Sequence, residues 1–212
     1  MQETGETARA HMKACTDSVH RRLHEVPLFD GLLRGTASLQ EYAMLMSVLA
    51  VFYRTLDASL ENACIRHPEW ECQYKYRPRA PLIEADVAAV GRKVGPIVNR
   101  HAASLQSTLP IIDSRASLAG VIYVVDGATL GGRLLNKAAA RLLNDDDAGG
   151  RSYWQWCDDH GALQWKAALV LVEACGQEQS QRRDMVEAAL ATFEALEEQF
   201  AIGAPVGLAG AA

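Results

Sequence analysis

The segment that most constrains the fold runs from Val121 to Gly132, where five apolar or aromatic residues (VIYVV) lead into a glycine-rich stretch (DGATLGG). A β-strand followed by a glycine loop could cradle phosphates and would make the chain a nucleotide binder. The glycines, however, match neither G-x-G-x-x-G nor G-x-x-x-x-G-K-[ST], and the chain offers no other convincing strands for a parallel sheet. We therefore interpret the segment as helical, with the phosphate loop as the alternative.

A helix through this segment would carry a glycine stripe formed by Gly120, Gly127 and Gly131. At about 100° per residue, these positions fall within about 40° of one another on one face. Each interior glycine costs about 1 kcal/mol relative to alanine, so the stripe indicates that something approaches the backbone closely. Two explanations remain: another helix packs tightly against the stripe, or a flat ligand lies against the exposed backbone. In the second case, the same glycines would also let the helix kink over the ligand.

The rest of the chain shows helical patterns separated by proline and turn residues. Helix-favouring residues extend from position 6 to 25 and end before Pro27. Ser38 and Glu41 form a capping box ahead of a second helix that should stop before Pro68. Residues 67–81 are expected to form an irregular surface connection. Further helices are expected through residue 105 with a break at Gly95-Pro96, over 115–143, over 153–175 and over 181–200.

These patterns predict an all-α fold with one domain over residues 1–200 and a flexible tail over 201–212. The chain has 212 residues, 49% of them hydrophobic, which is enough for a continuous core. A formal net charge of -5 makes nucleic acid an unexpected partner. Five scattered cysteines without a C-x-x-C pair indicate neither a disulfide framework nor a zinc site, and we expect a reducing cytoplasm. Neither a signal peptide nor a membrane span is expected.

Two motifs resemble the heme oxygenase family. The run KACTDSVH, from Lys13 to His20, resembles its proximal helix, in which a lysine stands seven residues before the histidine that binds iron. The run YVVDGATLGG, from Tyr123 to Gly132, resembles its glycine-rich distal helix, especially in the biliverdin-producing bacterial branch associated with bacteriophytochromes. The likeness continues more weakly to about Phe200. It implies a single helical domain with heme between a proximal and a kinked distal helix.

The resemblance also implies roles for individual residues. His20 would bind the heme iron through a neutral imidazole nitrogen, although without the resemblance it would be taken for an ordinary surface histidine. His24, one turn later, would support His20, because an H-x-x-x-H pair lacks an evident third metal ligand. Lys13 and Lys166 would meet the heme propionates. The remaining implied heme and oxygen contacts are Tyr123, Gly127, Ala128, Thr129 and Gly131.

One residue departs from the family pattern. Many heme oxygenases place an aspartate directly after the first distal glycine, where it organises the water that protonates bound dioxygen, but this chain has Ala128. Its methyl group cannot hold water, so other groups such as Thr129 would have to do so. Asp126 is about 160° further around the helix and could help only if the helix were rotated or unwound. The bacteriophytochrome-associated branch also uses a small residue here.

The resemblance implies a monooxygenase that opens heme to biliverdin and releases CO and ferrous iron, with heme as both cofactor and substrate. Dioxygen and electrons from a ferredoxin, flavodoxin or reductase would be required, and a bacteriophytochrome could accept the product. A heme carrier or sensor that has lost turnover is the second hypothesis, supported by Ala128. A third is a cofactor enzyme of the related helical fold used in thiamine and quinone metabolism.

Overall fold

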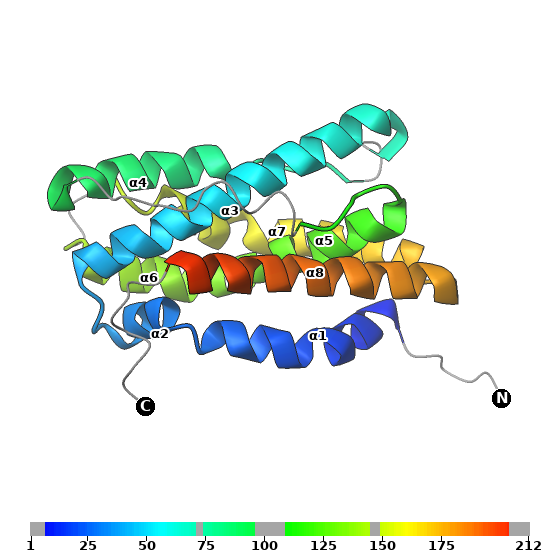
Figure 1. Ribbon diagram of the computed structural model, residues 1–212, viewed down its shortest axis with the longest axis horizontal. Coiled ribbons are helices and arrows are strands. Elements are labelled where there is room, and N and C mark those ends of the chain that lie inside the picture. The colour runs from blue at the N-terminus through cyan, green and yellow to red at the C-terminus, as the bar shows by residue number, and fades with distance from the viewer. Residues whose placement is uncertain (1–6, 71–73, 96–108, 145–148, 204–212) are drawn as a thin grey trace.

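The structure is a computed structural model that describes residues 7–70, 74–95, 109–144 and 149–203. Within these residues the ordered elements are all helices, which confirms the predicted all-α class (Figure 1). They are α1 (Ala8–His24), α2 (Pro27–Arg34), α3 (Leu39–Arg66), η1 (Pro68–Trp70), α4 (Ala80–Val94), α5 (Arg115–Ala128), η3 (Thr129–Gly131), α6 (Gly132–Leu142), α7 (Ser152–Cys175) and α8 (Gln179–Gly203).

Helix α8 lies in the middle of the assembly. It packs against α1, α3 and α5, and α5 in turn packs against α7 (Figure 1). Helices α1 and α2 lie on one side of α8, while α3 and α4 lie on the other. Tyr42, Phe52 and Leu56 of α3 are completely or almost completely buried, so α3 supplies a large part of the core.

Local signals account for most helix boundaries. The Ser38 hydroxyl accepts from the Glu41 backbone N–H at 3.2 Å, and the Glu41 carboxylate accepts from the Ser38 N–H at 2.7 Å, so the predicted capping box is present. Helix α2 was not predicted. Its eight residues are too few to show a clear periodic pattern, but Pro27 begins it and Gly35, with φ of 73°, ends it in the left-handed region.

Of two further predictions, a helix break was correct and a surface connection was only partly so. Helix α4 ends at Val94, just before the expected break at Gly95, and the predicted continuation over 96–105 falls outside the described residues. The connection after α3 was expected at the surface, yet Trp70, Tyr74 and Arg79 are buried. The described part of this connection is therefore divided: these three side chains enter the core, while others such as Lys75 and Arg77 are exposed as predicted.

The glycine-rich segment is helical but not one continuous helix. Val121 to Val125 lie inside α5, so the strand and phosphate-loop alternative is wrong. The predicted helix over 115–143 is divided at Thr129–Gly131, where one 3₁₀ turn separates α5 from α6. Such a turn inside a helix often marks a functional or strained position.

The glycine stripe does not act as one surface. A Cβ atom at Gly120 would stand 2.2 Å from the Met185 carbonyl oxygen of α8, so this glycine permits helix packing. Gly132 similarly meets Cys157 of α7, with 2.2 Å between the added Cβ and that of Cys157. At Gly131 an added Cβ would meet nothing within 4 Å. The packing explanation therefore holds for Gly120, while Gly131 faces open space.

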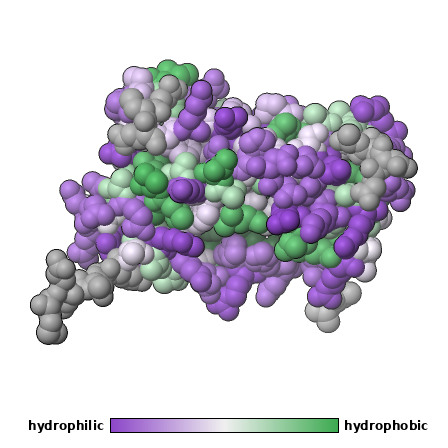
Figure 2. All heavy atoms as spheres, turned by 180° about the vertical axis from the view of Figure 1, so that it is seen from behind, coloured by the Kyte–Doolittle hydropathy of each residue, from purple (hydrophilic) through white to green (hydrophobic). Residues whose placement is uncertain are grey.

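Two stretches are long and apolar enough to cross a membrane by length and composition alone. They are Leu39–Arg66 and Arg115–Leu142, and 72% and 56% of their most apolar 18-residue windows are buried inside the fold. Buried core helices meet the same criteria. On the face shown in Figure 2, apolar residues form separate patches among polar side chains. Both stretches are thus explained as core helices.

Candidate functional site

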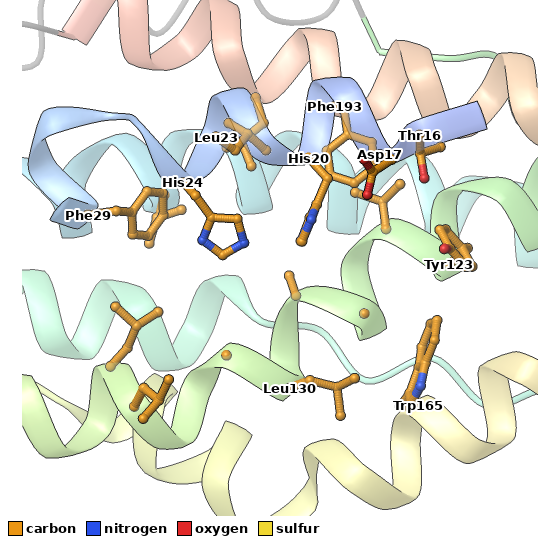
Figure 3. A pocket seen from close by; sticks show the side chains of 18 of the residues that line it. Thr16, Asp17, His20, Leu23, His24, Phe29, Tyr123, Leu130, Trp165 and Phe193 are labelled. Carbon is orange, nitrogen blue, oxygen red and sulfur yellow. The ribbon is translucent and has the colours of Figure 1, made fainter. Parts of the chain in front are cut away.

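A cavity of about 400 Å³ lies between α1 and the turn that joins α5 to α6 (Figure 3). Both walls are predominantly apolar, and a small number of polar side chains are placed among them. Volumes of this order and a lining of this type are characteristic of sites for small organic ligands and cofactors. The contributing side chains include Leu23, Phe29, Leu33, Leu49, Val124, Leu130, Leu134, Leu135, Trp154, Trp165, Phe193 and Leu196.

The α1 wall presents two histidines. His20 and His24 both line the cavity, and their rings make an edge contact with 4.6 Å between centroids. Phe193 of α8 supports His20 from behind, with its ring centroid 6.0 Å away. Figure 3 shows the His20 ring directed across the cavity toward the α5–α6 turn.

Helix α1 is held in place near both ends. The Glu173 carboxylate of α7 accepts hydrogen bonds from the backbone N–H groups of Ala8 and Arg9, at 3.1 and 3.0 Å. Near the other end, the Arg22 guanidinium makes two hydrogen bonds of 2.8 Å to the Glu197 carboxylate of α8. These contacts fix the helix while its cavity face stays available to a ligand.

The environment favours the neutral form of His20. Partial burial, and then the neighbouring His24, lower the pKa of His20 below its ordinary value of 6.5, while Asp17 opposes this shift. Only an unprotonated ring nitrogen can bind a metal ion, so the lowered pKa leaves His20 able to offer a nitrogen lone pair near neutral pH. The described residues contain no group of three or more His, Cys, Asp or Glu side chains that could hold a metal ion by themselves.

The opposite wall is formed by backbone and small side chains. Gly127, Ala128 and Gly131 line it, so a flat ligand can approach the helix closely here. An added Cβ at Gly127 would come within 3.4 Å of the Trp165 ring, and the Trp165 and Tyr123 rings are 5.3 Å apart. These aromatic rings limit the cavity at one end of the glycine-rich wall.

The structure brings seven of the nine predicted site residues to this cavity. They are Lys13, His20, His24, Tyr123, Gly127, Ala128 and Gly131. Thr129 does not line it, because the side chain is buried on another face and its hydroxyl donates to the Asp126 carbonyl at 2.6 Å. Lys166 is exposed and also lies outside the lining. Asp126 is fully buried, pairs with Arg79 and is not one of the lining residues.

Two lining tyrosines were not predicted. Tyr53 comes from α3 and Tyr153 from α7, and the Tyr153 hydroxyl donates to the Tyr53 hydroxyl at 2.9 Å. Burial raises the pKa of each tyrosine, so both hydroxyls stay protonated. The two residues are 100 positions apart, and no local pattern in the sequence marks them as neighbours.

Three comparisons with known proteins all point to heme oxygenases. The heme oxygenase family model matches residues 6–201. A heme oxygenase from Xanthomonas campestris pv. campestris (strain 8004) is 28% identical over 123 residues, which cover 57% of this chain and 66% of that relative. The chain thus spans just under two thirds of that relative's length. The structure of heme oxygenase from Leptospira interrogans superposes with a TM-score of 0.66 at 16% identity, over 92% of this chain and 98% of that one.

Proposed function

The chain belongs to the heme oxygenase family, and we propose that it binds one heme in the cavity between α1 and the α5–α6 turn and opens the ring to biliverdin, releasing CO and ferrous iron. The observation that carries this proposal is the pairing of a neutral histidine on one cavity wall with bare glycine backbone on the other. Such an arrangement suits a porphyrin, because a porphyrin is flat, apolar over most of its area and bound through iron at its centre.

The residues present fit this ligand. The apolar lining can cover the ring faces, and the open space at Gly131 leaves room for a small molecule beside the backbone. Arg9 and Lys13 lie on the α1 wall and can pair with carboxylates at the edge of the ring. When bound, the heme supplies the iron that activates dioxygen and is also the molecule consumed.

His20 is proposed as the iron ligand, with His24 beside it. The lowered pKa of His20 keeps a nitrogen lone pair available, and Phe193 packs behind the ring. The contact between the two rings restricts the rotation of His20, as supporting residues commonly do for metal-binding histidines.

Proton delivery must proceed without a carboxylate at Ala128. The Tyr53 hydroxyl accepts from Tyr153, which leaves its own proton free for a water molecule or a ligand in the cavity. Burial raises the pKa of Tyr53, so its hydroxyl stays protonated and can donate a hydrogen bond. The Tyr53–Tyr153 pair is therefore our candidate for the group that orders water opposite His20.

The proposed reaction needs partners. Electrons would come from an external ferredoxin, flavodoxin or reductase in the cytoplasm, and a bacteriophytochrome is a candidate acceptor of biliverdin if the chain belongs to that branch. A heme carrier or sensor is the second candidate function, because Ala128 removes the usual water-holding side chain. Adding ferric heme, a reductant and dioxygen separates the two: formation of biliverdin supports the enzyme, and stable oxyheme supports the carrier.

A matched pair of variants tests the ligand assignment. His20→Ala should abolish the absorption spectrum of histidine-bound heme while the far-ultraviolet circular dichroism stays that of the wild type. His24→Ala, one helical turn away on the same cavity wall, should retain the histidine-bound spectrum. If His20→Ala keeps that spectrum and His24→Ala loses it, the assignment is reversed.

A further inference from the structure

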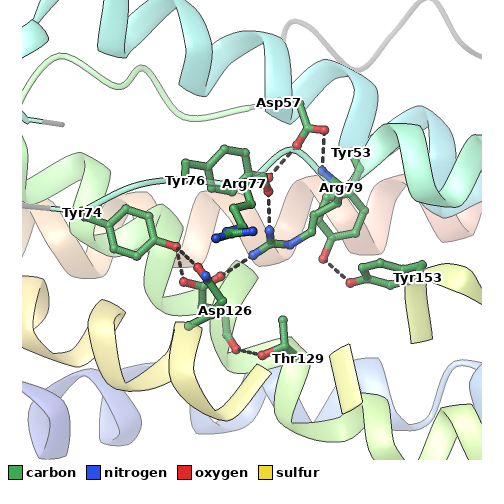
Figure 4. A network of polar contacts seen from close by, with 10 residues as sticks. Tyr53, Asp57, Tyr74, Tyr76, Arg77, Arg79, Asp126, Thr129 and Tyr153 are labelled. Carbon is green, nitrogen blue, oxygen red and sulfur yellow. Dashed lines mark hydrogen bonds and ion pairs between the residues drawn. The ribbon is translucent and has the colours of Figure 1, made fainter. Parts of the chain in front are cut away.

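A charged pair lies buried behind the glycine-rich wall (Figure 4). Nη2 of Arg79 is 2.7 Å from Oδ1 of Asp126, and both side chains are completely inaccessible to solvent. The second carboxylate oxygen of Asp126 accepts a hydrogen bond from the Tyr74 hydroxyl. The Asp126 carboxylate of α5 is thus bound by two residues from the connection between α3 and α4.

Arg79 is itself fixed from several directions. The Asp57 carboxylate of α3 accepts from the backbone N–H groups of Arg79 and Ala80 at 2.8 and 2.7 Å, and from the Tyr76 hydroxyl at 2.5 Å. The guanidinium carbon lies 4.0 Å from the centroid of the Trp156 ring of α7. The pair therefore ties α5 to a site that α3 and α7 hold rigid.

Stability alone is a poor explanation for this pair. Removing two charges from water is costly, and replacing a buried ion pair with well-packed apolar side chains is often neutral or stabilising. What such a pair can provide is a defined position, because the guanidinium meets the carboxylate only in a narrow range of geometries. The pair is therefore expected to define the position of a nearby part of the backbone.

The pair acts where α5 ends. Asp126 directly precedes Gly127, and its carbonyl accepts from the Thr129 hydroxyl at the point where the helix narrows into the 3₁₀ turn. Gly127 and Gly131, on the cavity side of the same turn, lack side chains that could restrict the backbone. An anchor on the buried side is thus suited to hold the cavity side still.

We propose that Arg79 and Asp126 are positioning residues that fix the backbone of residues 127–131 at the cavity wall and so set the space available to a small molecule opposite His20. The inference rests on the proposed heme site and extends it to residues that do not touch the cavity. Weakening the pair should let the turn shift, and this would change how small ligands reach and contact heme iron.

The test uses the full chain loaded with ferric heme. Asp126→Asn removes the charge and keeps the shape, and Arg79→Lys keeps the charge and loses the planar fork. Tyr42→Phe is the matched control, because it also removes a buried polar contact of α3, but the Tyr42 hydroxyl donates at 2.6 Å to the Gly150 carbonyl and not to Arg79 or Asp126. The rate of cyanide association and the stretching frequency of CO on the reduced protein are measured for each.

We expect the cyanide rate to change about tenfold in Asp126→Asn and Arg79→Lys, which corresponds to about 1.4 kcal/mol in the barrier. The CO frequency should shift in the same two variants, whereas Tyr42→Phe should lower the melting temperature and leave both ligand readouts near the wild type. Wild-type ligand behaviour in both pair variants, or an equal change in Tyr42→Phe, would overturn the positioning role. If Asp126→Asn does not fold, Tyr74→Phe is used in its place, because this variant removes one hydrogen bond to the same carboxylate.

Amide hydrogen exchange of the apo-protein separates this inference from the proposed function. Should the wild type bind no heme, the proposed function fails, but the anchor can still be judged. Faster exchange in Asp126→Asn confined to residues 127–132 then supports the anchor, and unchanged or global exchange contradicts it.

Discussion

Replacing Gly120 or Gly131 of the glycine stripe by alanine should have opposite effects on the stability of the apo-protein. Gly120→Ala places a methyl group 2.2 Å from the Met185 carbonyl oxygen and 3.0 Å from the Ala188 Cβ. Gly131→Ala places it where nothing lies within 4 Å, and the backbone there, with φ of -73° and ψ of -17°, is one that alanine adopts readily. The chemistry of the change is identical, so only the surroundings differ.

The magnitudes follow from these surroundings. Replacing glycine by alanine in a compatible conformation stabilises a protein by about 0.4–1 kcal/mol, which should be the whole effect at Gly131. At Gly120 the obstacle is backbone, which cannot rotate away, so α5 and α8 must separate and the overpacking cost of about 1–3 kcal/mol or more outweighs that gain. The intrinsic gain is common to both variants, so they should differ by the overpacking cost of about 1–3 kcal/mol, or about 2–12 °C in melting temperature for a chain of this size.

Thermal unfolding of both apo-variants, followed by heme titration, measures this difference. Gly120→Ala should melt well below the wild type. Gly131→Ala should melt at or slightly above it but bind heme more weakly, because the methyl group enters the cavity, and Gly131→Leu should weaken binding further. The reasoning is refuted if Gly120→Ala is as stable as the wild type, or if Gly131→Ala loses as much apo stability as Gly120→Ala.

Three further predictions concern the heme site directly. Burial lowers the pKa of His20 below 6.5, so protons should compete with iron for the ring nitrogen only at more acid pH. Heme affinity should therefore persist as the pH falls through 6.5 and weaken below it. A loss of heme affinity centred at or above pH 6.5 in a pH series would contradict this. Lys13→Ala should change the ratio of biliverdin isomers, because a difference of about 1.4 kcal/mol between two heme orientations changes their populations tenfold. Lys166 is exposed and outside the cavity lining, so Lys166→Ala should leave the isomer ratio unchanged; chromatography of the products measures both ratios. Ala128→Asp should alter the rate of turnover or the acid–base titration of the ferric heme spectrum by adding a carboxylate to the cavity wall; if only this variant forms biliverdin, the native chain is a carrier.

Sequence patterns predicted the long helices well because their signals are local. The capping box at Ser38 and Glu41 needs only four consecutive residues, and α7 and α8 follow continuous helical patterns. Residues 204–212 of the predicted tail lie outside the described residues, and α8 extends three residues past the predicted domain limit at 200. The short α2 was missed, since tertiary packing decides elements this short. The kink in the glycine-rich helix was expected from the family resemblance, but its position and 3₁₀ form at Thr129–Gly131 were not predicted.

The candidate site was predictable where its residues lie in one helix. His20, His24, Gly127 and Gly131 belong to two local motifs, and the structure places the motifs on facing walls. The role given to Thr129 depended on the side its hydroxyl would face, and the break after Ala128 leaves it buried against the Asp126 carbonyl.

Long-range polar contacts could not be predicted in this way. Arg79 and Asp126 are 47 residues apart, and an arginine beside prolines in a connecting segment is usually exposed. Nothing in either local sequence indicates that the arginine is buried against an aspartate and a tryptophan ring. Only the packing of α3, α5 and α7 brings these groups together.

The attachment of α1 to α8 has a consequence for the order of events during synthesis. The contact between Arg22 and Glu197 joins residues 175 positions apart, so the helix that carries His20 reaches its supporting surface only after α8 has left the ribosome. Contacts this distant in sequence also form late in folding, because a long loop must close first. A nascent chain would therefore carry its histidine helix undocked until α8 has been made, and the cavity between α1 and the α5–α6 turn could not be complete before that point.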